Sequence, residues 1–70
     1  MVLVDLPRFR YHLARAGKTQ RQLARALRIE ESALSAALRG RRPLTAELAR
    51  AIAAQLGVTL KAIALAEGRP

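Results

Sequence analysis

The feature that most restricts the fold of this chain is a series of short apolar stripes with helical spacing, separated by residues that end or begin helices. In the first stripe, apolar side chains recur at every third or fourth position: they are Leu6, Phe9, Leu13 and Ala16. This spacing places them on one face of an α-helix, whereas a strand would require alternation. Gly17 follows, and glycine readily adopts the left-handed conformation in which many helices end. Strand-forming residues are few and form no run longer than two outside Val2-Leu3-Val4, so we predict an all-α fold.

Capping residues and glycine or proline stops divide the chain into five expected helices, all within one domain of residues 1–70. Thr19 and Gln22 have the spacing of a capping box, in which each side chain accepts a hydrogen bond from the other residue's backbone N–H. Asp5, Thr45 and Thr59 stand at similar starting positions. The expected helices cover residues 6–16, 20–27, 31–38, 46–56 and 60–66.

The composition argues against several kinds of site. The chain has no cysteine and a single histidine, which rules out disulfides, leaves too few ligands for zinc and fits a reducing compartment. It contains no Ser/His/Asp or Cys/His set and no glycine-rich phosphate loop, so we expect neither an enzyme nor a cofactor. No segment approaches the roughly 20 apolar residues that span a bilayer, and the N-terminus does not read as a signal peptide. The sequence therefore predicts a cytoplasmic protein that does not enter membranes.

Positive charge is concentrated in the first part of the chain. The whole sequence has 13 Lys and Arg against 5 Asp and Glu, a net charge of +8, and residues 1–42 carry +7 of it. Such a concentration indicates a polyanionic partner, because neutralising phosphates releases their counterions. The alternative is that arginine serves only as a general solubilising residue.

Two short helices joined by a tight turn, expected at residues 20–27 and 31–38, are typical of a helix-turn-helix. The residues that carry this pattern are Thr19-Gln20-x-x-Leu23-Ala24-x-x-Leu27-x-Ile29, then Leu34-Ser35, then Gly40. Together they resemble the Cro/repressor (xenobiotic-response-element) family of DNA-binding domains. The run Leu48-Ala49-x-x-Ile52-Ala53-x-x-Leu56-Gly57-Val58 resembles the fourth helix of that family and the turn after it. The resemblance thus covers most of the chain.

The resemblance implies a five-helix DNA-binding domain that reads a double-stranded operator as a homodimer, with residues 31–38 in the major groove. It implies a transcription regulator, a repressor of phage, plasmid or toxin–antitoxin type. The implied base-facing residues are Glu31, Ser32, Ser35 and Ala36. The implied phosphate-facing residues are Lys18, Thr19, Gln20, Arg21, Arg39, Arg41 and Arg42. For Lys18 and Arg21 an ordinary solvated surface is the alternative, and for Glu31 it is stabilisation of a helix N-terminus by negative charge.

Two residues depart from the family pattern. Arg28 stands at a turn position where the family often has glycine, so it takes a positive φ or the turn differs. Glu30 stands where a serine or threonine cap is usual, and it is a poorer cap.

The sequence suggests several candidates for a homodimer interface and two alternatives to a sequence-specific regulator. Val2, Val4 and Leu65 are candidates for a homodimer interface. One rival function is a protein-interaction module, such as an antitoxin-like partner. The other is a sequence-indifferent nucleic-acid binder, favoured by the few base-reading groups on residues 31–38.

Overall fold

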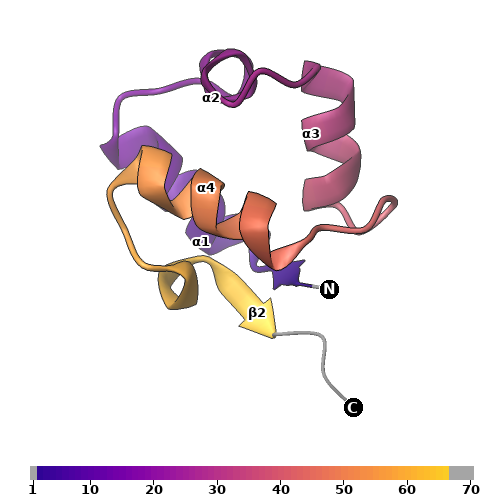
Figure 1. Ribbon diagram of the computed structural model, residues 1–70. Helices are drawn as coiled ribbons and strands as arrows, with labels where there is room; N and C mark the ends of the chain where they lie inside the picture. The colour runs from indigo at the N-terminus through magenta and orange to yellow at the C-terminus, as the bar shows by residue number, and fades with distance from the viewer. Residues whose placement is uncertain (1, 67–70) are drawn as a thin grey trace.

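Capping side chains begin three of the four α-helices in residues 2–66, the part of the chain that this computed structural model describes (Figure 1). The helices are α1 (Leu6–Arg15), α2 (Gln20–Ala26), α3 (Glu31–Leu38) and α4 (Ala46–Leu56). Asp5 Oδ1 accepts from the Arg8 N–H at 3.2 Å, and Thr45 Oγ1 accepts from the Leu48 N–H at 3.1 Å. The Thr19 capping box of α2 is also present, and Glu30 makes no side-chain cap bond at the start of α3. All four helices begin where they were expected to begin, and the missing bond at Glu30 agrees with its expected weakness as a cap.

Three of these helices end at a glycine in the same way. The N–H of each glycine donates to the carbonyl three residues back, and the next N–H donates to the carbonyl five residues back. This pair of bonds, the Schellman motif, satisfies carbonyls that a helix end leaves without partners, and it needs a residue with positive φ. The glycines are Gly17, Gly40 and Gly57, with φ of 69°, 78° and 72°. The predicted ends of α3 and α4 are confirmed, whereas α1 and α2 each end one residue earlier than predicted.

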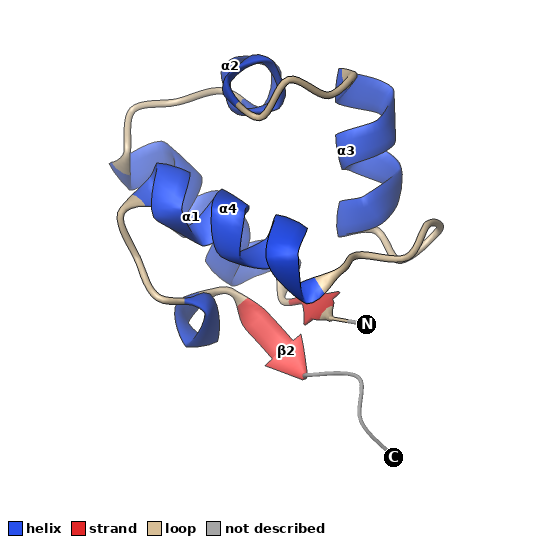
Figure 2. Ribbon diagram, in the orientation of Figure 1, coloured by secondary structure: helices blue, strands red, loops and turns tan. Residues whose placement is uncertain are grey.

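The prediction of a fifth α-helix over residues 60–66 is wrong. Leu60–Ala62 form a single turn of 3-10 helix, η1, and Ala64–Ala66 form a strand, β2. This strand pairs antiparallel with β1 (Leu3–Val4), and the small sheet lies at the opposite end of the molecule from α2 (Figure 2). The fold is therefore mostly helical with a two-stranded sheet, and the prediction of an all-α chain is corrected in this respect.

Contacts between the two ends of the described chain explain this outcome. Thr59 makes no side-chain cap bond, so little favours a helix locally. The Asp5 N–H instead donates to the Ile63 carbonyl at 2.9 Å, which fixes β1 beside the chain that enters β2. Ile63 is fully buried in the core. Tertiary pairing and burial thus outweigh the weak helical preference of residues 60–66.

The core lies between the helices and the sheet, and each α-helix contributes to it. Its fully buried large side chains are Phe9, Leu23, Leu34, Leu44, Ile52 and Ile63. Val2 also belongs to the core: it is 5% exposed, and its N–H donates to the Leu44 carbonyl at 2.9 Å. Val2 therefore offers little side-chain surface to a homodimer interface, contrary to expectation. None of the described helices has the length and apolar character needed to cross a membrane.

Candidate nucleic-acid interface

Helices α2 and α3 and the turn between them form a unit that packs on the core. The small side chain of Ala24, 2% exposed, lies on the buried face of α2 next to the turn. The Ile29 N–H donates to the Ala24 carbonyl at 3.0 Å, and the Ile29 side chain packs against the core. The side of α3 that faces inward carries Leu34 and Leu38. Each helix is thus anchored by its apolar face, which leaves the opposite face of α3 outside.

Arg28 occupies the left-handed position at the end of α2. Its φ is 60°, and it is the one non-glycine residue with positive φ in the described chain. The Arg28 N–H donates to the Arg25 carbonyl at 3.1 Å, and the Ile29 N–H donates to the Ala24 carbonyl at 3.0 Å. These two bonds form the same Schellman motif that the glycines form at the ends of the other helices. Of the two expected solutions, the chain adopts the positive φ.

The four residues predicted to face bases lie on one side of α3. Glu31 and Ser32 are exposed, and Ser35 and Ala36 are partly exposed. With 3.6 residues per turn, these four positions lie on one side of α3: Ser32 and Ala36 are farthest from the inward Leu34, and Glu31, three residues before Leu34, lies at the edge of this side. Glu31 also lies in the first turn of α3, where a negative charge is favourable. The structure thus brings these residues together, and their contacts with bases remain a prediction.

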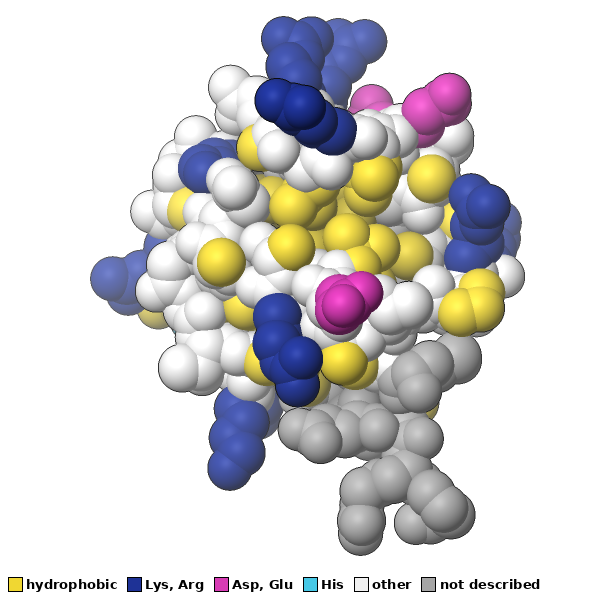
Figure 3. Space-filling view, in the orientation of Figure 1, with side chains coloured by type: hydrophobic (Ala, Val, Ile, Leu, Met, Phe, Trp, Pro, Cys, Tyr) yellow, Lys and Arg dark blue, Asp and Glu magenta, His cyan; other side chains and the backbone are white. Residues whose placement is uncertain are grey.

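Three arginines follow α3 directly, and all three are exposed: Arg39, Arg41 and Arg42. The backbone of this loop is fixed, because the N–H groups of Arg41 and Arg42 both donate to the Ala36 carbonyl, at 2.8 and 3.3 Å. Within residues 2–66 the one ion pair joins Arg8 to Asp5, so these three guanidinium groups have no acidic partner there. In Figure 3, basic side chains project beside α2 and at the edge beyond the end of α3, while acidic side chains lie near the start of α3. The loop therefore presents free positive charge next to the outer face of α3.

The other residues predicted to face phosphates surround the start of α2. Arg21 is exposed, Gln20 is partly exposed, and the Thr19 hydroxyl accepts the capping bond from the Gln22 N–H at 3.1 Å. Lys18 differs from them, because its ammonium group donates to Gln55 in the last turn of α4. The structure therefore groups Gln20 and Arg21 with the free surface and directs Lys18 toward the body of the protein.

Arg25 is a basic residue of this surface that the sequence analysis did not single out. It lines a shallow recess between α2 and the start of α3 together with Arg21, Ile29, Glu30 and Glu31. The signal was present in the sequence, because Arg21 and Arg25 are four residues apart in one helix and share a face. Arg21 and Arg25 thus share this recess with Glu30 and Glu31, but none of these four residues forms an ion pair within the described chain.

On the outer surface of α1, Arg15 is held by Tyr11 rather than by an acid. The Arg15 Nη1 group donates to the Tyr11 hydroxyl at 3.0 Å. This hydrogen bond, together with the charge of the tyrosine when ionised, raises the pKa of Arg15. Arg15 therefore keeps its positive charge and adds to the basic character of the molecule outside the predicted site.

Comparison with known proteins agrees with this geometry. A family model described as Helix-turn-helix matches residues 10–63, from the middle of α1 to the residue that follows η1. The match includes α2, the turn at Arg28, α3 and all of α4. No curated protein and no solved structure shows a significant match to the chain.

Proposed function

The chain belongs to the Cro/C1-type helix-turn-helix family of DNA-binding regulatory domains, and on this premise we propose that it is a sequence-specific repressor that reads an operator as a homodimer. The observation that carries the proposal is the position of the polar face of α3 beside three exposed arginines without acidic partners in the described chain. A helix that can enter the major groove and a cationic loop that can meet the phosphates lie side by side.

The basic loop supplies affinity that does not depend on sequence. Arg39, Arg41 and Arg42 are exposed, and their backbone is tied to the end of α3. Guanidinium groups bind phosphate oxygens with two parallel hydrogen bonds, and each neutralised phosphate releases counterions. In this proposal the loop sets how deeply α3 enters the groove.

The outer face of α3 supplies discrimination among sequences. Glu31 can accept a hydrogen bond from the amino group of cytosine or adenine, and Ser32 and Ser35 can donate or accept. Ala36 offers only a methyl group, which suits contact with the methyl group of thymine. These are few groups, so one α3 discriminates weakly, and DNA shape is expected to contribute.

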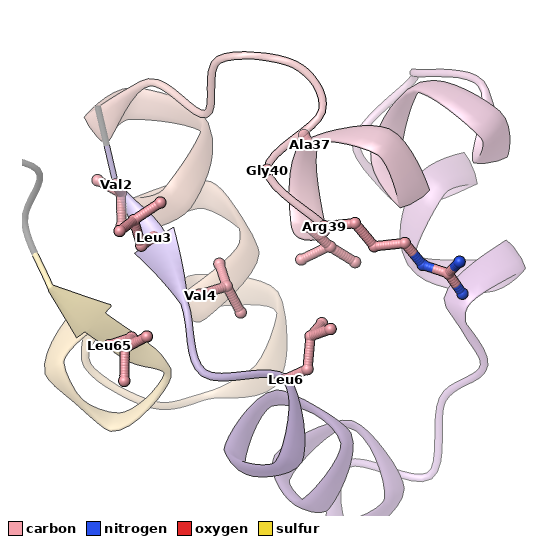
Figure 4. Close-up of a pocket in the computed structure, with 9 residues that line it drawn as sticks. Val2, Leu3, Val4, Leu6, Ala37, Arg39, Gly40 and Leu65 are labelled. Atoms are coloured by element: carbon pink, nitrogen blue, oxygen red, sulfur yellow. The ribbon is translucent and has the colours of Figure 1, made fainter.

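A homodimer would double the number of base contacts, with two α3 helices spaced about 34 Å apart along the duplex. The sheet end of the molecule offers apolar surface for such an assembly. Leu3 is 37% exposed and Leu65 is 66% exposed, and both line a groove between the sheet and the end of α3 (Figure 4). Val4, partly buried, lines the same groove. Leu65 and Val4 therefore remain interface candidates, and Leu3 joins them.

A competition assay tests the proposal. The protein is incubated with a pool of genomic DNA fragments and an excess of random-sequence duplex, and the bound fragments are sequenced. Retention of a small set of fragments supports a sequence-specific regulator. Absence of binding without competitor would refute DNA binding. A variant with Arg39, Arg41 and Arg42 replaced by alanine is the control, and it is expected to lose binding while remaining folded.

One observation favours a second candidate, a sequence-indifferent nucleic-acid binder. Three of the four outward residues of α3 are short, namely Ser32, Ser35 and Ala36, whereas the positive charge around them is large. In the same assay this candidate predicts that the excess of random-sequence duplex displaces every fragment equally.

A further inference from the structure

Lys18 links two parts of the molecule that are far apart in the sequence. Its Nζ donates to the backbone carbonyl of Gln55 at 3.0 Å and lies 3.3 Å from the Gln55 side-chain oxygen. Lys18 immediately precedes Thr19, which caps α2, and Gln55 lies in the last turn of α4. The contact therefore joins the start of α2 to the end of α4.

The ammonium group suits this place because the closing turn of α4 leaves the Gln55 carbonyl without a backbone donor in the described chain. The last carbonyls of a helix have no acceptor role within it, and they form the negative end of its dipole. At the end of α4, the carbonyls of Ala53 and Ala54 accept from the closing N–H groups of Gly57 and Val58. The Gln55 carbonyl accepts from Lys18, and the last turn of α4 contains no basic residue of its own. Lys18 thus supplies both a hydrogen bond and the complementary charge.

We propose that Lys18 is a positioning residue of the DNA interface and does not bind phosphate itself. This inference rests on the proposed function. Lys18 is half-buried and its ammonium group is engaged with Gln55, so it would have to leave both oxygens to reach a phosphate. In its observed place it fixes the start of α2, and with it Gln20 and Arg21, against α4. Without this contact, DNA binding would have to supply the free energy that holds the start of α2 against the end of α4.

The salt dependence of DNA binding separates the two roles. The full chain is titrated with a short random-sequence duplex at several salt concentrations, at a temperature where circular dichroism shows each variant to be folded. Lys18→Met is expected to weaken binding about fivefold, the equivalent of one net hydrogen bond, while the log–log salt slope stays at the wild-type value. Arg41→Ala, which removes a proposed phosphate contact, is expected to reduce the slope by about 0.9 per subunit.

Two further variants control for charge and for folding. Lys61→Met removes the same charge from an exposed residue of η1 that makes no side-chain hydrogen bond to the described chain, so it is expected to change neither affinity nor slope appreciably. Gln55→Ala keeps the net charge, removes one of the two acceptors, and is expected to weaken binding by less than Lys18→Met. It replaces that variant if Lys18→Met does not fold.

Three results would overturn the inference. A slope that falls in Lys18→Met as much as in Arg41→Ala would show a phosphate contact. Unchanged affinity of folded Lys18→Met or, where that variant does not fold, of Gln55→Ala would show that the contact serves stability alone. If the wild-type protein does not bind the duplex, the proposed function fails first, and the positioning role fails with it.

Discussion

Replacing Arg28 with glycine is expected to stabilise the folded protein, although a whole side chain is removed. Arg28 closes α2 with φ of 60°, in the motif that Gly17, Gly40 and Gly57 close at the ends of the other three described α-helices. Its side chain is exposed and makes no hydrogen bond to the described chain. The substitution therefore relieves backbone strain and gives up little packing.

The expected magnitude follows from two opposing effects. A residue with a Cβ atom costs about 1–2 kcal/mol in the left-handed region, and glycine avoids this cost. Glycine also gives the unfolded chain more freedom, which opposes folding by about 0.4–1 kcal/mol. We expect the free energy of unfolding to rise by about 0.5–1 kcal/mol and Tm to rise by about 2–8 °C for a domain of this size.

Urea and thermal unfolding followed by circular dichroism measure the effect in wild type, Arg28→Gly and Arg28→Ala. The alanine variant removes the same charge and side chain but keeps a Cβ atom in the left-handed conformation. It is expected to stay within about 0.5 kcal/mol of wild type, as exposed substitutions usually do. If Arg28→Gly is no more stable than Arg28→Ala, the strain attributed to this position is refuted.

The remaining predictions concern the interface, a cap and assembly. Arg41→Ala should weaken binding to every single-base operator variant alike, and a loss confined to one base pair would reassign this residue to readout. Glu31→Gln should raise general DNA affinity by removing a charge that repels phosphates, and should relax preference at one base pair per half-site by about 1–3 kcal/mol if Glu31 reads a base. If specificity is unchanged and the free energy of unfolding falls by up to about 1 kcal/mol, Glu31 only stabilises the N-terminus of α3 with its negative charge. Thr45→Ala should cost about 1 kcal/mol in urea unfolding, and Thr59→Ala, which loses no cap bond, should cost less; equal costs would contradict the capping account. Leu65→Asp should lower the fraction of protein that sediments as a dimer while the monomer stays folded. An unchanged fraction of dimer would place the interface elsewhere.

The parts of the fold set by local chemistry were predictable from the sequence. The Thr19 capping box, the Asp5 and Thr45 caps and the glycine stops are short-range features, and the predicted bounds of α3 and α4 agree with the structure. The positive φ of Arg28 was one of the two solutions that its place in the turn allowed. The grouping of Glu31 and Ser35 on one face follows from helical periodicity alone.

The parts set by contacts between distant residues were not predictable. The local sequence of Ala64–Ala66 does not indicate a strand. These residues form one because they pair with β1, which is about 60 positions away in the sequence. The burial of Val2, a predicted interface candidate, depends on the same end of the fold and on a hydrogen bond to Leu44, and neither can be read from its place in the sequence. The contact between Lys18 and Gln55 spans 37 positions, and only the folded arrangement of α2 and α4 reveals it.

Selection of bound sites from a library of random duplexes tests the central claim most directly. The wild-type protein is incubated with the library, the bound duplexes are amplified through repeated rounds, and the enriched sequences are aligned. Two copies of α3 about 34 Å apart on one face of the duplex predict a two-fold symmetric consensus with half-sites about 10 base pairs apart, centre to centre. A bound pool with no enriched sequence would contradict sequence-specific reading, and an enriched asymmetric site would contradict the homodimer.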